Sequence, residues 1–227
     1  MALALEMPLL VNPPTTDQSS LSRLIERAAK GDKAAFEQVM IHSEQRVMAM
    51  TWRMLGNEAD ARDASQEVFL RVYKYLGRYR GDQDFFAWLY GISVNVCRDA
   101  LRKRQSHSSR FVSFGEDAGE AHEVADGHLD ADQLLVQAQQ RELIAKAMAT
   151  LPFKERASIV LRDVEGLSTE EVARIMKSSA TTVRSQISSA RKKIRIYCQQ
   201  QGQKSQGRHA RENHAQDARA TWERKAR

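Results

Sequence analysis

Cysteine, proline and glycine are scarce in this chain of 227 residues, which contains 2 Cys, 4 Pro and 11 Gly. The two cysteines, Cys97 and Cys198, lie far apart, and neither belongs to a CxxC or Cys/His spacing. We therefore expect no disulfide framework and no zinc site, and a reducing compartment such as the cytoplasm is the default. The scarcity of Pro and Gly, together with long helical periodicities, predicts an all-α fold.

Long hydrophobic runs and catalytic motifs are also missing. The first eleven residues are apolar, but they have no basic n-region, contain Glu6 and are interrupted by Pro8. Neither a signal peptide nor a membrane insertion is therefore expected. The chain has no phosphate-binding glycine loop and no identifiable nucleophile–base pair, so we predict no catalytic residues, no metal and no cofactor. The formal charge of +6 and the pI of about 9.4 favour a polyanionic partner.

The composition of the chain changes at residue 105 and again at residue 131. Residues 105–130 carry six acidic residues against the single base Arg110, with little periodicity. This composition predicts a flexible acidic linker between two helical domains, 19–104 and 131–198. A disordered lead, 1–18, and a basic, flexible tail, 199–227, complete the organisation. Apolar periodicity predicts helices at 19–30, from a cap at Asp32 to 55, at 58–76, from a cap at Asp84 onward, at 131–150 and at 153–165.

The second domain contains a helix-turn-helix pattern. Ser168 and Glu171 form a capping-box pattern for a short helix, and a polar turn follows at 177–179. A second helix repeats Val183, Ile187 and Ala190 on its apolar face. An ordinary helical hairpin with a solvated basic face would give the same periodicity. The opposite face offers side chains that can bond phosphates and base edges: Thr182, Arg184, Ser185, Gln186, Ser188, Arg191 and Lys192.

Several ordered segments resemble the signatures of sigma factors. The run from Asp60 to Arg71 (DARDASQEVFLR) is similar to DAEDxxQEVFLR, and Arg80 to Asn95 is similar to RGxxxFxxWLYxIxxN. Leu151-Pro152, Arg156, the run from Val160 to Ser168 and the run from Thr182 to Ser185 complete the pattern. With two domains and a short linker, the chain resembles an extracytoplasmic-function (group 4) sigma factor of the sigma-70 family.

The resemblance implies how the first domain works. It implies that Asp60, Asp63, Gln66 and Glu67 dock on the β′ clamp helices of core RNA polymerase, although a solvated helix face is the simpler alternative. It also implies that the following loop and helix bind the −10 element as single-stranded DNA. The candidates there are Tyr79, Arg80, Asn95, Arg98, Arg102 and Lys103, and the competing explanation is that cations at a helix C-terminus suit its dipole. Phe85 and Trp88 are expected in the core.

The second domain would bind the −35 element and the β flap. Gln186 stands where the family usually has Arg, and Gln pairs best with adenine. An unusual −35 preference is therefore expected, with phosphate contacts from Arg184, Arg191 and Lys192.

Two functions are compatible with these features. The leading one is a sigma factor that binds core polymerase and directs promoter recognition, DNA melting and transcription initiation. The alternative is a free-standing helix-turn-helix repressor or activator. The resemblance further implies an anti-sigma factor that hides the polymerase and DNA faces.

Overall fold

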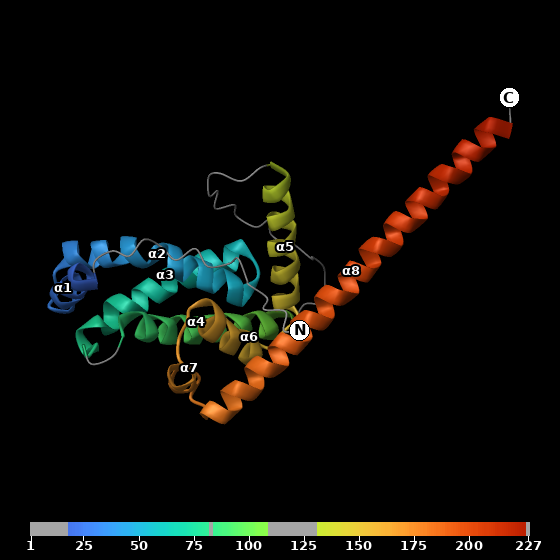
Figure 1. The fold of residues 1–227 in the computed structure, drawn as a ribbon. Helices are drawn as coiled ribbons and strands as arrows, with labels where there is room; N and C mark the ends of the chain where they lie inside the picture. Colours follow the sequence, from blue (N-terminus) through green and yellow to red (C-terminus); the bar gives the residue numbers. More distant parts are fainter. Residues whose placement is uncertain (1–17, 82–83, 109–130, 226–227) are drawn as a thin grey trace.

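The computed structural model describes residues 18–81, 84–108 and 131–225, and within these ranges every regular element is a helix (Figure 1). The predicted all-α class is confirmed. The predicted lead, almost in full, and most of the predicted linker lie outside the described residues. The start of the linker is corrected, because the preceding helix continues to Ser108 rather than ending at 104.

The N-terminal half (18–108) contains four α-helices, α1 Gln18–Ala29, α2 Lys33–Leu55, α3 Glu58–Tyr75 and α4 Phe85–Ser108, with a short 3-10 turn, η1 Leu76–Arg78, before α4. Helix α2 begins as predicted, since the Asp32 carboxylate accepts from the Ala35 backbone N–H at 3.0 Å. It ends at Gly56, whose φ of 79° is the left-handed conformation that glycine adopts without strain. Asn57 and Asp84 accept equivalent bonds at the starts of α3 and α4.

The C-terminal half (131–225) contains α5 Ala131–Ala149, α6 Phe153–Ile159, the π-helical turn η2 Val160–Val164, α7 Thr169–Met176 and α8 Ala180–Lys225. Helix α8 does not end near 198, so the expected flexible tail is helical in the structure. The sequence after Cys198 contains no proline and is rich in Gln, Ala and Arg, which are good helix formers. Figure 1 shows α8 leaving the body of the protein as one long rod.

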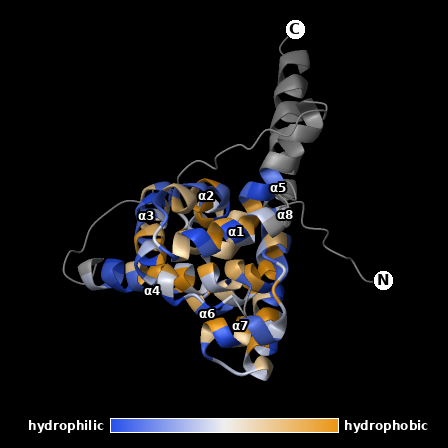
Figure 2. Ribbon diagram, turned by 90° about the vertical axis from the view of Figure 1, so that its left-hand side faces the viewer, coloured by the Kyte–Doolittle hydropathy of each residue, from blue (hydrophilic) through white to orange (hydrophobic). Residues whose placement is uncertain are grey.

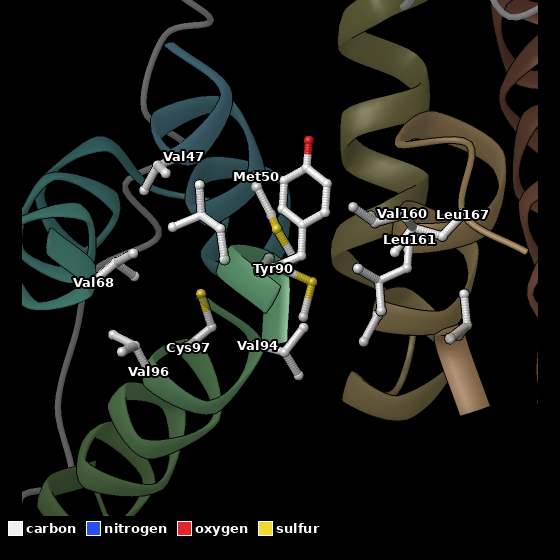
Figure 3. Close-up of a cluster of buried hydrophobic side chains, with 14 of the residues drawn as sticks. Val47, Met50, Val68, Tyr90, Val94, Val96, Cys97, Val160, Leu161 and Leu167 are labelled. Carbon is white, nitrogen blue, oxygen red and sulfur yellow. The ribbon is translucent and has the colours of Figure 1, made fainter. Parts of the chain in front are cut away.

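The two halves share one hydrophobic core. Buried residues of α2, α3 and α4, such as Met50, Val68 and Val94, belong to the same cluster as Val160 and Leu161 of η2. Figure 3 shows Tyr90 of α4 between these two groups of side chains. Figure 2 shows that apolar and hydrophilic residues alternate along these helices. The helices of the two halves therefore pack as one body, with α7 against α4 and α5 against α2.

Candidate nucleic-acid and polymerase interfaces

The helix-turn-helix is built by local capping and a small apolar core. Ser168 accepts from the Glu171 backbone N–H at 3.2 Å, and the Glu171 carboxylate accepts in return from the Ser168 backbone N–H at 2.7 Å. This predicted capping box is confirmed. The Ser168 hydroxyl also donates to the Glu171 carboxylate at 2.6 Å, and this bond, with the one from the Ser168 backbone N–H, lowers the pKa of Glu171. Lys177 ends α7 with a φ of 51°, and Ser179 accepts from the Thr182 backbone N–H to start α8. Buried residues on both helices then fix their crossing: Val172, Ala173, Val183, Ile187 and Ala190.

Most of the predicted DNA-reading residues stand on an open face of α8. We call this set the α8 polar face; its members are all exposed and are Thr182, Arg184, Ser185, Ser188 and Lys192. Arg184 lies 3.6 Å from the Glu170 carboxylate, but both side chains remain about two-thirds exposed (64% and 67%). Such a loose surface pair is worth little and leaves the guanidinium available.

Two predicted −35 residues bond to other elements of the protein. Gln186 is half-buried, and its side-chain oxygen accepts from the Ser158 hydroxyl of α6 at 2.7 Å. The expectation that Gln186 lies on the outward face is thus wrong, because α6 packs along that side of α8. Arg191 is exposed, yet it donates two bonds to Asp163 at 2.9 and 2.7 Å, and this partner raises the pKa of Arg191. A bidentate pair of this kind fixes α8 to η2.

The four predicted polymerase-docking residues on α3 differ in how strongly they are engaged within the protein. Asp60 accepts from Asn57 at 2.7 Å and lies 3.5 Å from Arg104. Glu67 accepts from Arg71 at 2.7 Å. Asp63 and Gln66, one turn apart, are both exposed. The structure therefore leaves Asp63 and Gln66 as the two most accessible members.

The predicted −10 loop and helix divide into exposed and covered residues. Arg80, Arg102 and Lys103 are exposed. Tyr79 is half-buried and packs edge-on against Phe85 at 5.8 Å and against Trp88 at 5.3 Å between ring centroids. Phe85 is buried, as expected, whereas Trp88 is half-buried.

Of the remaining two −10 candidates, Arg98 contacts the C-terminal half and Asn95 bonds to Arg98. Asn95 accepts from Arg98 at 3.1 Å, and both side chains are half-buried. The Arg98 guanidinium lies 5.5 Å from the centre of the Phe153 ring, at the start of α6. This is cation–π distance, so the C-terminal half covers part of the surface assigned to DNA.

Four side chains that were not predicted as site residues connect the halves: Glu165, Arg53, Tyr90 and Arg156. Glu165, which follows η2, pairs with Arg53 of α2 at 3.2 Å and accepts from the Tyr90 hydroxyl of α4. Arg156 of α6 is buried and donates to the Met54 carbonyl at the end of α2 at 2.8 Å. Arg156 and Glu165 stand within the sequence motifs, but no sequence signal indicates that their partners belong to the other half.

Burial and charge explain the ionisation of these groups. Burial raises the pKa of Tyr90, and the neighbouring Glu165 raises it further, so the phenol keeps its proton and donates. Burial lowers the pKa of Arg156, but three carbonyl oxygens accept its bonds: Met54, Ala149 and Leu151. Burial also raises the pKa of the Cys97 thiol to about 12, as expected for an inert core residue.

The described residues contain no cluster of His, Cys, Asp and Glu suited to a metal ion. Among them, no helix is long and apolar enough to cross a membrane. The described residues thus form two helical halves, with exposed Asp63 and Gln66 on α3 in the first and a helix-turn-helix in the second.

Comparisons with known proteins identify the family. Residues 40–107 match Sigma-70 region 2, and residues 141–194 match Sigma-70 region 4. The chain is 34% identical over 176 residues to the ECF RNA polymerase sigma-E factor of Escherichia coli K12, covering 75% of this chain and 90% of that one. It is 29% identical over 179 residues to the RNA polymerase sigma-H factor of Pseudomonas aeruginosa, covering 78% and 93%.

Solved structures show the same fold. The sigma factor RpoE from Bartonella quintana, in complex with the anti-sigma factor NepR, matches with a TM-score of 0.61 and 21% identity over 72% of this chain and 96% of that one. CnrH in complex with the cytosolic domain of CnrY matches with a TM-score of 0.53 and 26% identity over 77% and 94%.

The chain belongs to the extracytoplasmic-function group of the sigma-70 family. Its function is that of a sigma factor, which binds core RNA polymerase and directs it to promoters for transcription initiation. Proteins of this family are initiation factors rather than enzymes. The alternative of a free-standing repressor or activator is not favoured by these matches.

Proposed function

We propose that the three interfaces divide the work of promoter recognition, with α3 docking on the β′ clamp helices, α4 binding the single-stranded −10 element and α8 binding the duplex −35 element. The C-terminal half would also contact the β flap. The protein would act in the cytoplasm, where core polymerase and promoter DNA are found, and would perform no catalysis of its own.

The α8 polar face is the observation that carries this proposal. It presents two cations, Arg184 and Lys192, among the hydroxyls of Thr182, Ser185 and Ser188, all exposed at the start of the second helix of a helix-turn-helix. The N-terminal part of such a helix enters the major groove, where cations bind phosphates and hydroxyls bond base edges. With Gln186 bonded to Ser158, base readout falls to Arg184 and Ser185 first.

Helix α3 supports the docking assignment by its charge. Asp63 and Gln66 are exposed beside Asp60 and Glu67, so the surface is acidic despite the overall charge of +6. Asp60 and Glu67 are held in place by Asn57 and Arg71. Acidic groups fixed in position against a basic partner set the register of docking and raise the rate of encounter.

An anti-sigma factor is part of the proposal. The Bartonella sigma factor with the same fold was solved with its anti-sigma factor bound. For this chain, such a partner would act by denying α3 to polymerase and α4 and α8 to DNA.

The decisive experiment is run-off transcription with core polymerase across a library of promoters. We expect specific transcripts only when core and this protein are both present. Asp63→Lys should weaken core binding at least tenfold in a pull-down or fluorescence titration, with an unchanged circular dichroism spectrum. Glu26→Lys is the matched control, because Glu26 is an exposed acid on α1, outside the docking surface. Normal core binding by Asp63→Lys would remove α3 from the docking site.

A further inference from the structure

We propose that this sigma factor closes on itself through a latch centred on Glu165, and that the closed form keeps α4 from DNA until the two halves separate. The proposal rests on the proposed assignment of α4 to the −10 element. We define the latch by its three side chains, Glu165, Arg53 and Tyr90.

The latch is a partly desolvated charge pair between the halves. The Glu165 side chain is only 10% exposed and the Arg53 side chain 21% exposed, and one carboxylate oxygen pairs with each partner: Oε1 with Arg53 and Oε2 with the Tyr90 hydroxyl. Both oxygens of the carboxylate are therefore occupied by groups of the N-terminal half. Removing one member of such a pair leaves a charge with no compensation, which strongly disfavours the closed arrangement.

Other contacts around the latch align the surfaces. Arg156 donates to the Met54 carbonyl, so a buried cation of the C-terminal half occupies the C-terminal end of α2. A Cβ placed on Gly91 of α4 would lie 4.0 Å from the Ile175 side chain of α7. Helix α7 of the helix-turn-helix thus lies directly on α4.

The closed arrangement conflicts with binding both promoter elements. Elements centred near −35 and −10 are about 25 base pairs apart, which is about 85 Å along B-form DNA. Helices α7 and α4 are in contact in this structure. Asn95 and Arg98 are half-buried, and Arg98 lies over Phe153 of the C-terminal half. The halves must therefore part before α4 and α8 reach their elements together.

Chain length permits this separation. The segment 109–130 joins α4 to α5, and a chain of this length reaches about 75 Å when fully extended. Together with the dimensions of the domains themselves, this reach is sufficient for the two elements. Opening needs no unfolding of either half, only loss of the contacts between them.

The test compares full-length variants in the absence of polymerase. Glu165→Lys places a cation opposite Arg53 and should open the protein, whereas Glu142→Lys makes the same charge change in the exposed Glu142–Lys146 pair on α5 and should not. Spin labels at Arg23→Cys on α1 and Lys154→Cys on α6, in a Cys198→Ser background, report the distance between the halves. We expect a longer distance for Glu165→Lys and an increase on the order of tenfold in its affinity for single-stranded −10 DNA, as loss of one buried partner can produce.

Two outcomes would overturn the latch: an unchanged label distance in a Glu165→Lys protein that is folded by circular dichroism, or equal single-strand affinity in wild type and variant. The swap Arg53→Glu with Glu165→Lys should restore the short distance, which separates loss of the pair from local damage. Run-off transcription distinguishes failure of the latch from failure of the proposed function. If wild-type protein with core gives promoter-specific transcripts while the label distance never responds, the latch fails and the proposed function stands; if no promoter is used, the proposed function fails.

Discussion

The two helices assigned to DNA, α4 and α8, are presented very differently. The α8 polar face is open, with Arg184 and Lys192 exposed at one side of the helix-turn-helix. On α4, Asn95 and Arg98 are half-buried, and the Arg98 guanidinium lies over Phe153 of the C-terminal half. An arginine is thus accessible to a phosphate on α8 (Arg184), whereas on α4 the arginine (Arg98) is packed against Phe153. We therefore expect the free protein to bind duplex DNA through α8 while α4 remains covered.

The largest effect should come from Arg156, which holds the covering half in place. Arg156→Ala removes a buried cation and leaves the carbonyls of Met54, Ala149 and Leu151 without their donor. Because each unsatisfied buried group is costly, we expect a loss of about 3 kcal/mol in the free energy of unfolding. Urea denaturation measures it, with Arg174→Ala, an exposed arginine on α7, as the control. A loss equal to that of the control would mean that water replaces Arg156 without penalty.

A smaller effect, on duplex DNA binding alone, should distinguish the role of α8 from that of α4. Arg184→Ala should weaken duplex binding by the free protein and lower its salt slope by about 0.9, the share of one phosphate contact. If Arg184 instead contacts a base, Arg184→Ala should lose about 1–3 kcal/mol of discrimination at one promoter position, and the salt slope of duplex binding should not change.

Arg98→Ala is the counterpart on α4. Its guanidinium is covered by Phe153, so the free protein should bind duplex with wild-type affinity and salt slope. Holoenzyme carrying Arg98→Ala should open promoters more slowly, measured by permanganate footprinting. Reduced duplex binding by free Arg98→Ala protein would show that α4 is already accessible and would erase the contrast between the helices.

Within α8, Arg191 and Lys192 should behave differently although they are neighbours. Arg191 donates two bonds to Asp163, whereas Lys192 is exposed on the polar face. We expect Lys192→Ala to lower the salt slope of duplex binding by about 0.9 and Arg191→Ala to leave it nearly unchanged. Because the Arg191 side chain is 59% exposed, its loss should cost at most about 1 kcal/mol of stability. Equal salt slopes for the two variants would return Arg191 to the DNA-binding face.

The smallest effect concerns pH and the start of α7. The bonds from Ser168 lower the pKa of Glu171 in the folded protein, so its contribution is complete above the unfolded value, about 4.3, and is lost as pH falls through the folded value. Urea denaturation between pH 3 and 6 should therefore show a small loss of stability on the acid side. Glu171→Gln should flatten that part of the profile. An unchanged profile would mean that the carboxylate adds nothing beyond what an amide supplies.

Local signals in the sequence predicted the elements well. Asp32 and the Ser168/Glu171 pair cap the helices at the positions their side chains indicate, because an N-cap needs only a short polar group a few residues before the backbone it bonds. The apolar repeat Val183, Ile187 and Ala190 likewise predicted the buried face of α8. Such features depend on neighbours within one or two helical turns.

For Gln186 the local pattern predicted the wrong face of the helix. Gln186 lies three residues after Val183 and four before Ala190, so it stands at the edge of the buried face, and a stricter helical count would have indicated this. The Ser158 hydroxyl that bonds it comes from α6, however, and no spacing along α8 reveals that neighbour. Arg191 is exposed as predicted, but its partner Asp163 also belongs to another element, and no spacing along α8 indicates that pair.

By itself, the sequence determined the helices, their caps, the helix-turn-helix and the acidic and basic character of the separate faces. Each of these follows from side-chain chemistry at a spacing of three or four residues. Only the tertiary structure decided that Glu165 pairs with Arg53, that Arg156 bonds the end of α2 and that Phe153 covers Arg98. These contacts join residues about a hundred positions apart or belong to opposite halves. The free energy of these contacts depends on how well two folded surfaces fit each other, and a local sequence pattern carries no information about that fit.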